Sequence, residues 1–123
     1  MDTRFKIVDA SAIRGRKAKI VTGYFDPLLA WHAEKLEALR GGAEVFAAAV
    51  LPLRDELVGQ RARAELVAAL RVIDYVLIAS GADFEAFGDV AAALDAAQVV
   101  RLDEEDLRRR AELIADVRSR PTR

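Results

Sequence analysis

The chain has 123 residues, of which 53% are hydrophobic and 32% charged, and this composition predicts one folded domain over residues 1–118 with a frayed tail at 119–123. A formal net charge of −1 provides no overall field for polyanions, and no apolar run is long enough to span a bilayer, so neither nucleic acid nor a membrane is expected as a partner. The absence of Cys excludes disulfides, thiolate metal sites and Cys nucleophiles, and it favours a cytoplasmic location.

Four short apolar runs have the length of strands and are nearly continuous rather than alternating, as in strands that are covered on both faces. They lie at residues 19–22, 45–51, 75–79 and 98–102. Because helical patterns separate them, the chain is expected to form right-handed βαβ units. The predicted fold class is α/β, a Rossmann-like open parallel sheet of four to five strands with helices on both faces and the first strand central.

The helical patterns start and stop at residues that suit helix ends. The first helix is expected to begin at Asp26–Pro27, since an Asp can cap it and a Pro at the first position wastes no amide hydrogen. It is expected to end at Gly41–Gly42, since glycine tolerates the left-handed cap. Two further helices are predicted over residues 60–72 and 84–96.

The last helix has the clearest start, because Asp103 can cap it and the acidic run 103–106 suits the positive end of the helix dipole. Three consecutive arginines, residues 108–110, could mark a phosphate or nucleic-acid patch, but the acidic residues around them favour a solvated helix face, and no function is assigned to them. One apolar stripe is predicted at Leu107, Ala111, Ile114 and Val117.

The segment from Lys19 to His32 is the one that suggests chemistry, because a buried strand runs through Gly23 into a helix. The carboxyl end of a parallel strand and the amino end of the next helix form the usual ligand crevice, where free amides and the helix dipole favour phosphate. The sequence therefore predicts an anion site around residues 23–26.

Three stretches carry a family resemblance. Gly23-Tyr24-Phe25-Asp26 looks like the opening of a signature in which Gly, an aromatic residue and Asp precede His-x-Gly-His. The stretch from Arg63 to Val76 is similar to an Arg-led helix entering a Val-Asp-Tyr-Val-like strand, and residues 13–23 look like a basic lead-in. Over residues 12–79 the chain resembles the nucleotidyltransferase superfamily, of the cytidylyltransferase type that includes glycerol-3-phosphate and heptose-phosphate nucleotidyltransferases.

The resemblance implies transfer of a CMP or AMP group from CTP or ATP, with Mg²⁺, onto a small phosphorylated alcohol or sugar. It assigns His32 as the catalytic residue that supports the transferring phosphate. It assigns no metal ligand to the protein. Nucleotide binding falls to Gly23, Tyr24, Phe25, Asp26 and Arg63.

The His-x-Gly-His positions fall on Leu29, Ala30, Trp31 and His32, so only the last one matches. A Ser/Thr-rich loop with an Arg, which the family commonly uses late in the chain to hold the triphosphate, is also missing. The hypothesis favoured by these departures is a cytidylyltransferase-like domain with weak or lost activity, acting as a nucleotide- or phosphate-binding or self-associating module. The alternative is an active nucleotidyltransferase.

Several residues keep a structural alternative. Asp26 could act as a helix cap, Trp31 as an apolar anchor, and Arg63 as a helix surface charge instead of a phosphate contact. A homodimer is expected, because a small sheet leaves apolar side chains uncovered and twofold pairs are the commonest assembly.

Overall fold

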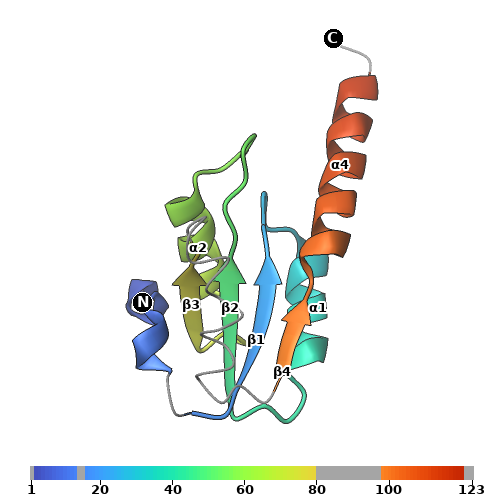
Figure 1. The fold of residues 1–123 in the computed structure, drawn as a ribbon. Helices are drawn as coiled ribbons and strands as arrows, with labels where there is room; N and C mark the ends of the chain where they lie inside the picture. The colour runs from blue at the N-terminus through green and yellow to red at the C-terminus, as the bar shows by residue number, and fades with distance from the viewer. Residues whose placement is uncertain (1, 14–15, 80–97, 121–123) are drawn as a thin grey trace.

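Four parallel strands form the centre of the computed structural model, which describes residues 2–13, 16–79 and 98–120 (Figure 1). Their order in the sheet is β3-β2-β1-β4, so β1 is central, with β2 on one side and β4 on the other. The open parallel sheet, its four predicted strands and the central place of the first are thereby confirmed. The strands are β1 (Ala18–Gly23), β2 (Val45–Val50), β3 (Tyr75–Ile78) and β4 (Gln98–Arg101).

The two middle strands, β1 and β2, are buried on both faces, which explains why they are apolar along most of their length. In β2, Phe46 and Ala48 belong to the core that also includes Leu36 of the first helix and Val67 of the second. The alternate residues of the same strand, among them Ala47, belong to a second core with Ile13 from the amino-terminal segment. The period-2 pattern of the strands thus divides their side chains between two cores.

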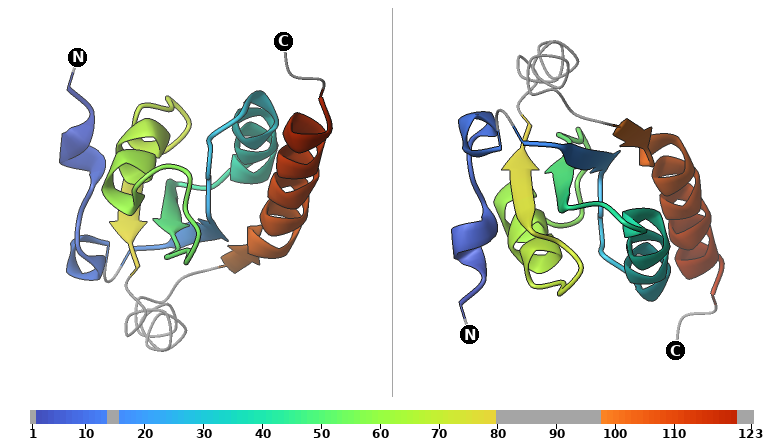
Figure 2. Two further views of the ribbon diagram at one scale, coloured as in Figure 1. Left: turned by 90° about the horizontal axis from the view of Figure 1, so that it is seen from above. Right: turned by 90° about the horizontal axis from the view of Figure 1, so that it is seen from below.

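The two helices between the strands, α1 (Ala30–Arg40) and α2 (Gln60–Ala68), lie on the same face of the sheet (Figure 2). Short 3₁₀ turns occupy Arg4–Lys6 and Ala10–Ala12. As predicted, α1 ends at Gly41, which has a φ of 50°. The helix expected at residues 84–96 lies outside the described residues.

The predicted start of the first helix at Asp26–Pro27 is wrong. Helix α1 begins at Ala30, with Leu29 as its N-cap residue, and the Asp26–Pro27 peptide bond is cis within the preceding turn. The physical reason is that the carboxylate of Asp26 accepts hydrogen bonds from the backbone of a different segment, the amides of Leu57 and Val58, and so does not cap α1.

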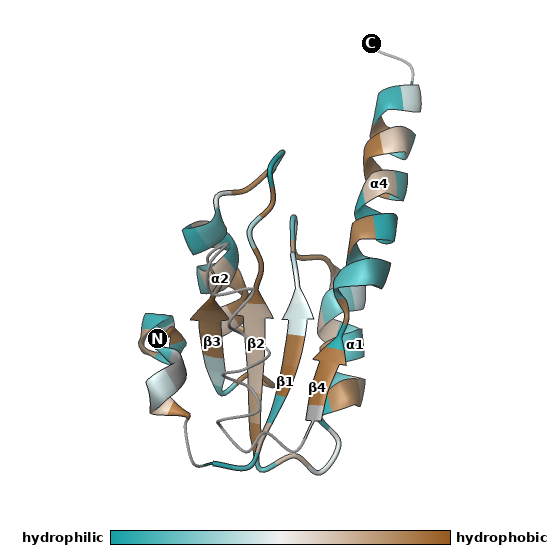
Figure 3. Ribbon diagram, viewed as in Figure 1, coloured by the Kyte–Doolittle hydropathy of each residue, from teal (hydrophilic) through white to brown (hydrophobic). Residues whose placement is uncertain are grey.

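Helix α4 (Asp103–Ser119) follows directly on β4 and runs past the carboxyl ends of the strands (Figure 1). Its start lies at the predicted acidic run, with all four acidic residues in the first turn. The prediction that Asp103 caps the helix is wrong: Leu102 is the N-cap residue, and the Asp103 carboxylate instead accepts hydrogen bonds from Thr22 and Arg101. The projecting part of α4 carries apolar residues among hydrophilic ones (Figure 3). None of the described helices combines the length and the apolar character that crossing a bilayer requires.

Candidate functional site

The turn after β1 lies where the strand order reverses, because the chain continues from β1 to β2 and β3 on one side and reaches β4 on the other. In open α/β sheets, ligands bind at such a point. At Gly23 the backbone passes close to two groups: a Cβ there would lie 2.8 Å from the Phe25 ring and 3.1 Å from Asp106 Oδ2. Phe25 itself adopts a positive φ of 51°. A residue without a side chain is therefore required at position 23.

The carboxylate of Asp106, in the first turn of α4, occupies the crevice. Its Oδ2 accepts hydrogen bonds from the backbone amides of Tyr24, at 2.8 Å, and Phe25, at 2.9 Å. Its Oδ1 lies 2.8 Å from Nε2 of His32. Both side chains of this pair are about 2% exposed. Three groups assigned to phosphate binding by the family resemblance thus converge on one carboxylate of the same chain.

His32 is held in one orientation from both sides of its ring. Its Nδ1 accepts a hydrogen bond from the Leu29 amide at 3.0 Å, as an N3 side chain does in a capping box. Because Nδ1 is an acceptor, the proton of the neutral ring lies on Nε2, which then donates to Asp106.

Trp31 covers the imidazole of His32, and Arg109 in turn lies over the Trp31 ring. The Trp31 ring stacks on it, with centroids 3.9 Å apart and ring planes 27° from parallel. The guanidinium of Arg109 lies 4.4 Å from the Trp31 centroid, a cation–π distance. The buried Nε1 of Trp31 has no hydrogen-bond partner among the described residues. The indole therefore packs as an apolar cover over the histidine.

Asp26 joins three segments beside the same crevice. Its oxygens accept hydrogen bonds from the amides of Leu57 and Val58, both at 2.7 Å, and from Nε of Arg110 at 3.0 Å. Asp26 is buried, and Arg110 is only 11% exposed at the side chain. The prediction of a solvated face for the arginine run is therefore wrong at Arg110, which pairs with a carboxylate that is distant in sequence.

Arg63 is fully buried, so the alternative of a helix surface charge is wrong. Its Nε donates to the carbonyl of Val58 at 2.8 Å, and its Nη1 donates to the carbonyls of Tyr24, at 2.7 Å, and Leu51, at 3.0 Å. Its Nη2 pairs with Glu56 at 2.8 Å. The guanidinium thus ties the carboxyl ends of β1 and β2 to the loop that precedes α2.

Asp103 adds a further negative charge at the rim of the crevice. Its Oδ1 accepts hydrogen bonds from Thr22 Oγ1 at 2.7 Å and Arg101 Nε at 2.9 Å. Burial alone would raise the pKa of this carboxyl, but the hydrogen bonds from Arg101 and Thr22 outweigh it and hold the pKa below its usual value. Burial, followed by the charge of Asp103, raises the pKa of the nearby Tyr24 phenol. The rim therefore remains anionic at neutral pH.

Asp106 is a residue of the crevice that the sequence did not single out as a site residue, although it was included in the start of the last helix. A signal for it existed: in a parallel sheet, an acidic run just after β4 must lie beside the carboxyl end of its neighbour β1. Among the described residues, no group of three or more His, Asp or Glu is placed to hold a metal ion.

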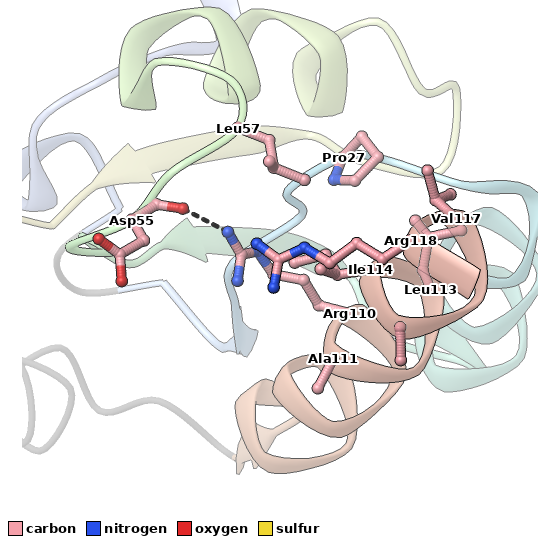
Figure 4. Close-up of a pocket in the computed structure, with 10 residues that line it drawn as sticks. Pro27, Asp55, Leu57, Arg110, Ala111, Leu113, Ile114, Val117 and Arg118 are labelled. Carbon is pink, nitrogen blue, oxygen red and sulfur yellow. Dashed lines mark hydrogen bonds between the residues drawn. The ribbon is translucent and has the colours of Figure 1, made fainter. Parts of the chain in front are cut away.

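A groove of about 870 Å³ opens next to Asp26 and Arg110, between α4 and the loop before α2 (Figure 4). Leu57 and Pro27 form one wall, and the projecting part of α4 forms the other. A hydrogen bond from Arg110 to the carbonyl of Asp55 joins the two walls. The groove is thus a surface feature separate from the crevice that Asp106 fills.

Comparison with known proteins informs the fold. No family model matches the chain, and no curated protein matches it. Among solved structures, it is similar to a lipopolysaccharide core biosynthesis protein from Thermoplasma volcanium GSS1, with a TM-score of 0.52 and 14% identity over 68% of this chain and 93% of that chain. The two chains share a Rossmann-like fold. At this identity the likeness extends to the fold alone.

The close packing around Gly23 leads to a prediction about stability. We expect Gly23→Ala to destabilise the fold by about 1–3 kcal/mol, because the new methyl group would overlap the Phe25 ring and crowd Asp106. Urea unfolding measures the change. Gly42→Ala is the matched control, since a Cβ there meets nothing within 4 Å, and it should change stability by no more than about 0.5 kcal/mol. Equal effects of the two variants would contradict the packing described at Gly23.

Proposed function

We propose that this chain is a cytidylyltransferase-like domain without transferase activity, which acts as a binding module. The observation that supports the proposal is the position of the Asp106 carboxylate, which accepts hydrogen bonds from the Tyr24 and Phe25 amides and lies 2.8 Å from His32 Nε2. These are the groups that the family resemblance assigns to phosphate. A triphosphate would have to displace a buried carboxylate that already satisfies all three donors.

Electrostatics add to this barrier. Asp103 and Asp106 both lie in the first turn of α4, and their carboxylates contact the crevice where the resemblance would place a triphosphate. Their charges interact favourably with the positive end of the α4 dipole. That end of α4 is then no longer available to an anionic ligand. Like charges at short range in a partly buried site repel a polyphosphate strongly.

The covering of His32 supports the proposal as well. In the resemblance, the residue before the last histidine of the motif is a glycine, which lets nucleotide and backbone come close. Here Trp31 stacks on the imidazole, and Leu29 supplies no side-chain donor to replace the missing first histidine. Mg²⁺ was expected only together with a nucleoside triphosphate, so a domain that binds no triphosphate has no role for it. A cytoplasmic location remains part of the proposal, on the absence of Cys.

Titration calorimetry with CTP, ATP and GTP in the presence of Mg²⁺ tests the proposed function. We expect no binding tighter than about 1 mM for any of the three nucleotides, because the phosphate donors are already used. Pyrophosphate release with glycerol 3-phosphate as acceptor should stay at the background rate. A dissociation constant below about 100 µM together with pyrophosphate release would instead establish the active nucleotidyltransferase. Circular dichroism of the same sample shows that the protein titrated is folded.

A further inference from the structure

Helix α4 leaves apolar surface uncovered along its projecting part. Leu107, which lies on α4 before the groove, is 42% exposed. Val117 lines the groove and is 56% exposed, and Leu57 on the facing wall is 57% exposed (Figure 4). Among the described residues, α4 is tied to the rest of the domain by hydrogen bonds and ion pairs from its first half, made by Asp103, Glu105, Asp106 and Arg110. Exposed apolar side chains that line a groove commonly mark a surface that another protein covers.

A stripe along α4, three of whose residues line the groove, follows a seven-residue order. Glu104, Ala111 and Arg118 are spaced by seven, with Leu107 and Ile114 three residues after the first two. Seven residues fall only about 20° short of two helical turns, so all five lie on one stripe of α4. Leu107 and Ile114 thus take one core position of a pairing helix, and Ala111 takes the other between two charged residues that lie at the ends of the stripe.

The stripe is complementary to itself in charge. Glu104 lies seven residues before Ala111, and Arg118 lies seven residues after it. Glu104 interacts with the charge of Arg101, but neither Glu104 nor Arg118 forms an ion pair with a described residue. Their neighbours Glu105 and Arg109 pair with each other along the helix. If two such stripes run antiparallel with Ala111 at the centre, each Glu104 lies opposite an Arg118.

We propose that α4 pairs antiparallel with α4 of a second copy of this chain, about a twofold axis at Ala111. The small side chain of Ala111 lets the two helices approach closely at the axis, and Leu107 and Ile114 are buried on either side. Glu104 and Arg118 form two equivalent ion pairs that fix the antiparallel direction. The proposal names the surface and the partner of the binding module proposed above, and rests on that role.

Charge reversal tests the pairing directly. Sedimentation equilibrium should show a dimer of the unaltered chain with a dissociation constant on the order of 10 µM. Glu104→Arg and Arg118→Glu should each weaken it by about tenfold, because either change puts like charges opposite each other at two places. The double variant Glu104→Arg with Arg118→Glu restores both pairs in reverse and should dimerise within about threefold of the unaltered chain.

Matched controls lie on the other helices. Glu37→Arg on α1 and Arg61→Glu on α2 change exposed charges away from the stripe and should leave the dimer unaffected. A monomer at about 100 µM, a double variant as weak as the single ones, or equal weakening by the controls would overturn the pairing. The nucleotide titration tests the proposed function independently. A dimer that binds CTP would support the α4 pairing but contradict the proposed loss of nucleotide binding. A monomer that binds no nucleotide would contradict the pairing but support the proposed function.

Discussion

Asp106→Ala is expected to destabilise the protein by about 3–5 kcal/mol. The substitution leaves the amides of Tyr24 and Phe25 and Nε2 of His32 buried without an acceptor, and each unsatisfied donor costs about 1–3 kcal/mol. Such a loss is a large part of the roughly 5–15 kcal/mol that stabilises a typical domain. Urea unfolding followed by circular dichroism measures it.

Two further variants show that the loss comes from the carboxylate. Asp106→Asn keeps one oxygen for the two amides but turns an NH₂ group toward the Nε2 proton, so we expect an intermediate loss of about 1–3 kcal/mol. Glu105→Ala removes the neighbouring carboxylate, whose ion pairs with Lys35 and Arg109 are partly exposed, and should cost at most about 1 kcal/mol. If Asp106→Ala were as mild as Glu105→Ala, Asp106 would not be the acceptor that closes the crevice.

Arg63→Ala should be equally damaging, with a loss of about 3–5 kcal/mol. The guanidinium is fully buried and satisfies the carbonyls of Tyr24, Leu51 and Val58, which come from three segments. Without it these carbonyls face a cavity, and the carboxyl ends of β1 and β2 lose the group that joins them. The free energy of unfolding in guanidinium chloride, checked by thermal unfolding, measures the effect.

The controls for Arg63 separate the carbonyl contacts from the ion pair. Arg61→Ala, two residues earlier on α2 and exposed, should lie within about 0.5 kcal/mol of the unaltered chain. Glu56→Gln removes only the partly exposed charge partner and should cost no more than about 1 kcal/mol. A loss for Glu56→Gln as large as that for Arg63→Ala would show that the ion pair, and not the carbonyl network, is the main contribution.

The strands were predictable because their signal is local. In β1 and β2 the apolar run is covered on both faces, so the run itself contains the information, and all four predicted strands lie within about one residue of those observed. The glycine at which α1 ends and the acidic start of α4 were predictable for the same reason, since both depend on the conformation or charge of the helix end itself.

The predictions that were wrong concern side chains whose partners are distant in sequence. Asp26 was expected to cap the helix that follows it, and Arg110 was expected to face solvent. Instead they pair with each other, and Asp26 accepts hydrogen bonds from the Leu57 and Val58 amides. A polar side chain can form a hydrogen bond either with a neighbour in the sequence or with a distant group. The sequence around it does not indicate which of the two partners it has in the fold. Arg63 was left undecided for the same reason, since its acceptors are backbone carbonyls that any sequence supplies.

For the site, the resemblance pointed to the turn after β1 but did not indicate that the Asp106 carboxylate lies there. The turn from Gly23 to Asp26 follows the central strand, as predicted, and lies where the strand order reverses. The convergence of its donors on Asp106 depends on the pairing of β4 with β1, which brings the start of α4 to the turn. The assignment of His32 and the turn residues to a nucleotide stays a prediction, which the titration tests.

The closed crevice also has a consequence for how the chain folds as it is synthesised. The hydrogen bonds that close it join residues 74 to 84 positions apart. Contacts of such long range form slowly, because a long loop must be closed before they contribute. Strands β1, β2 and β3, with α1 and α2, all precede Asp106 and can associate while translation continues at roughly 5–20 residues per second. Closure of the crevice is therefore a late step in folding. Until Asp106 has been synthesised, the amides of Tyr24 and Phe25 and Nε2 of His32 lack the carboxylate that accepts their hydrogen bonds.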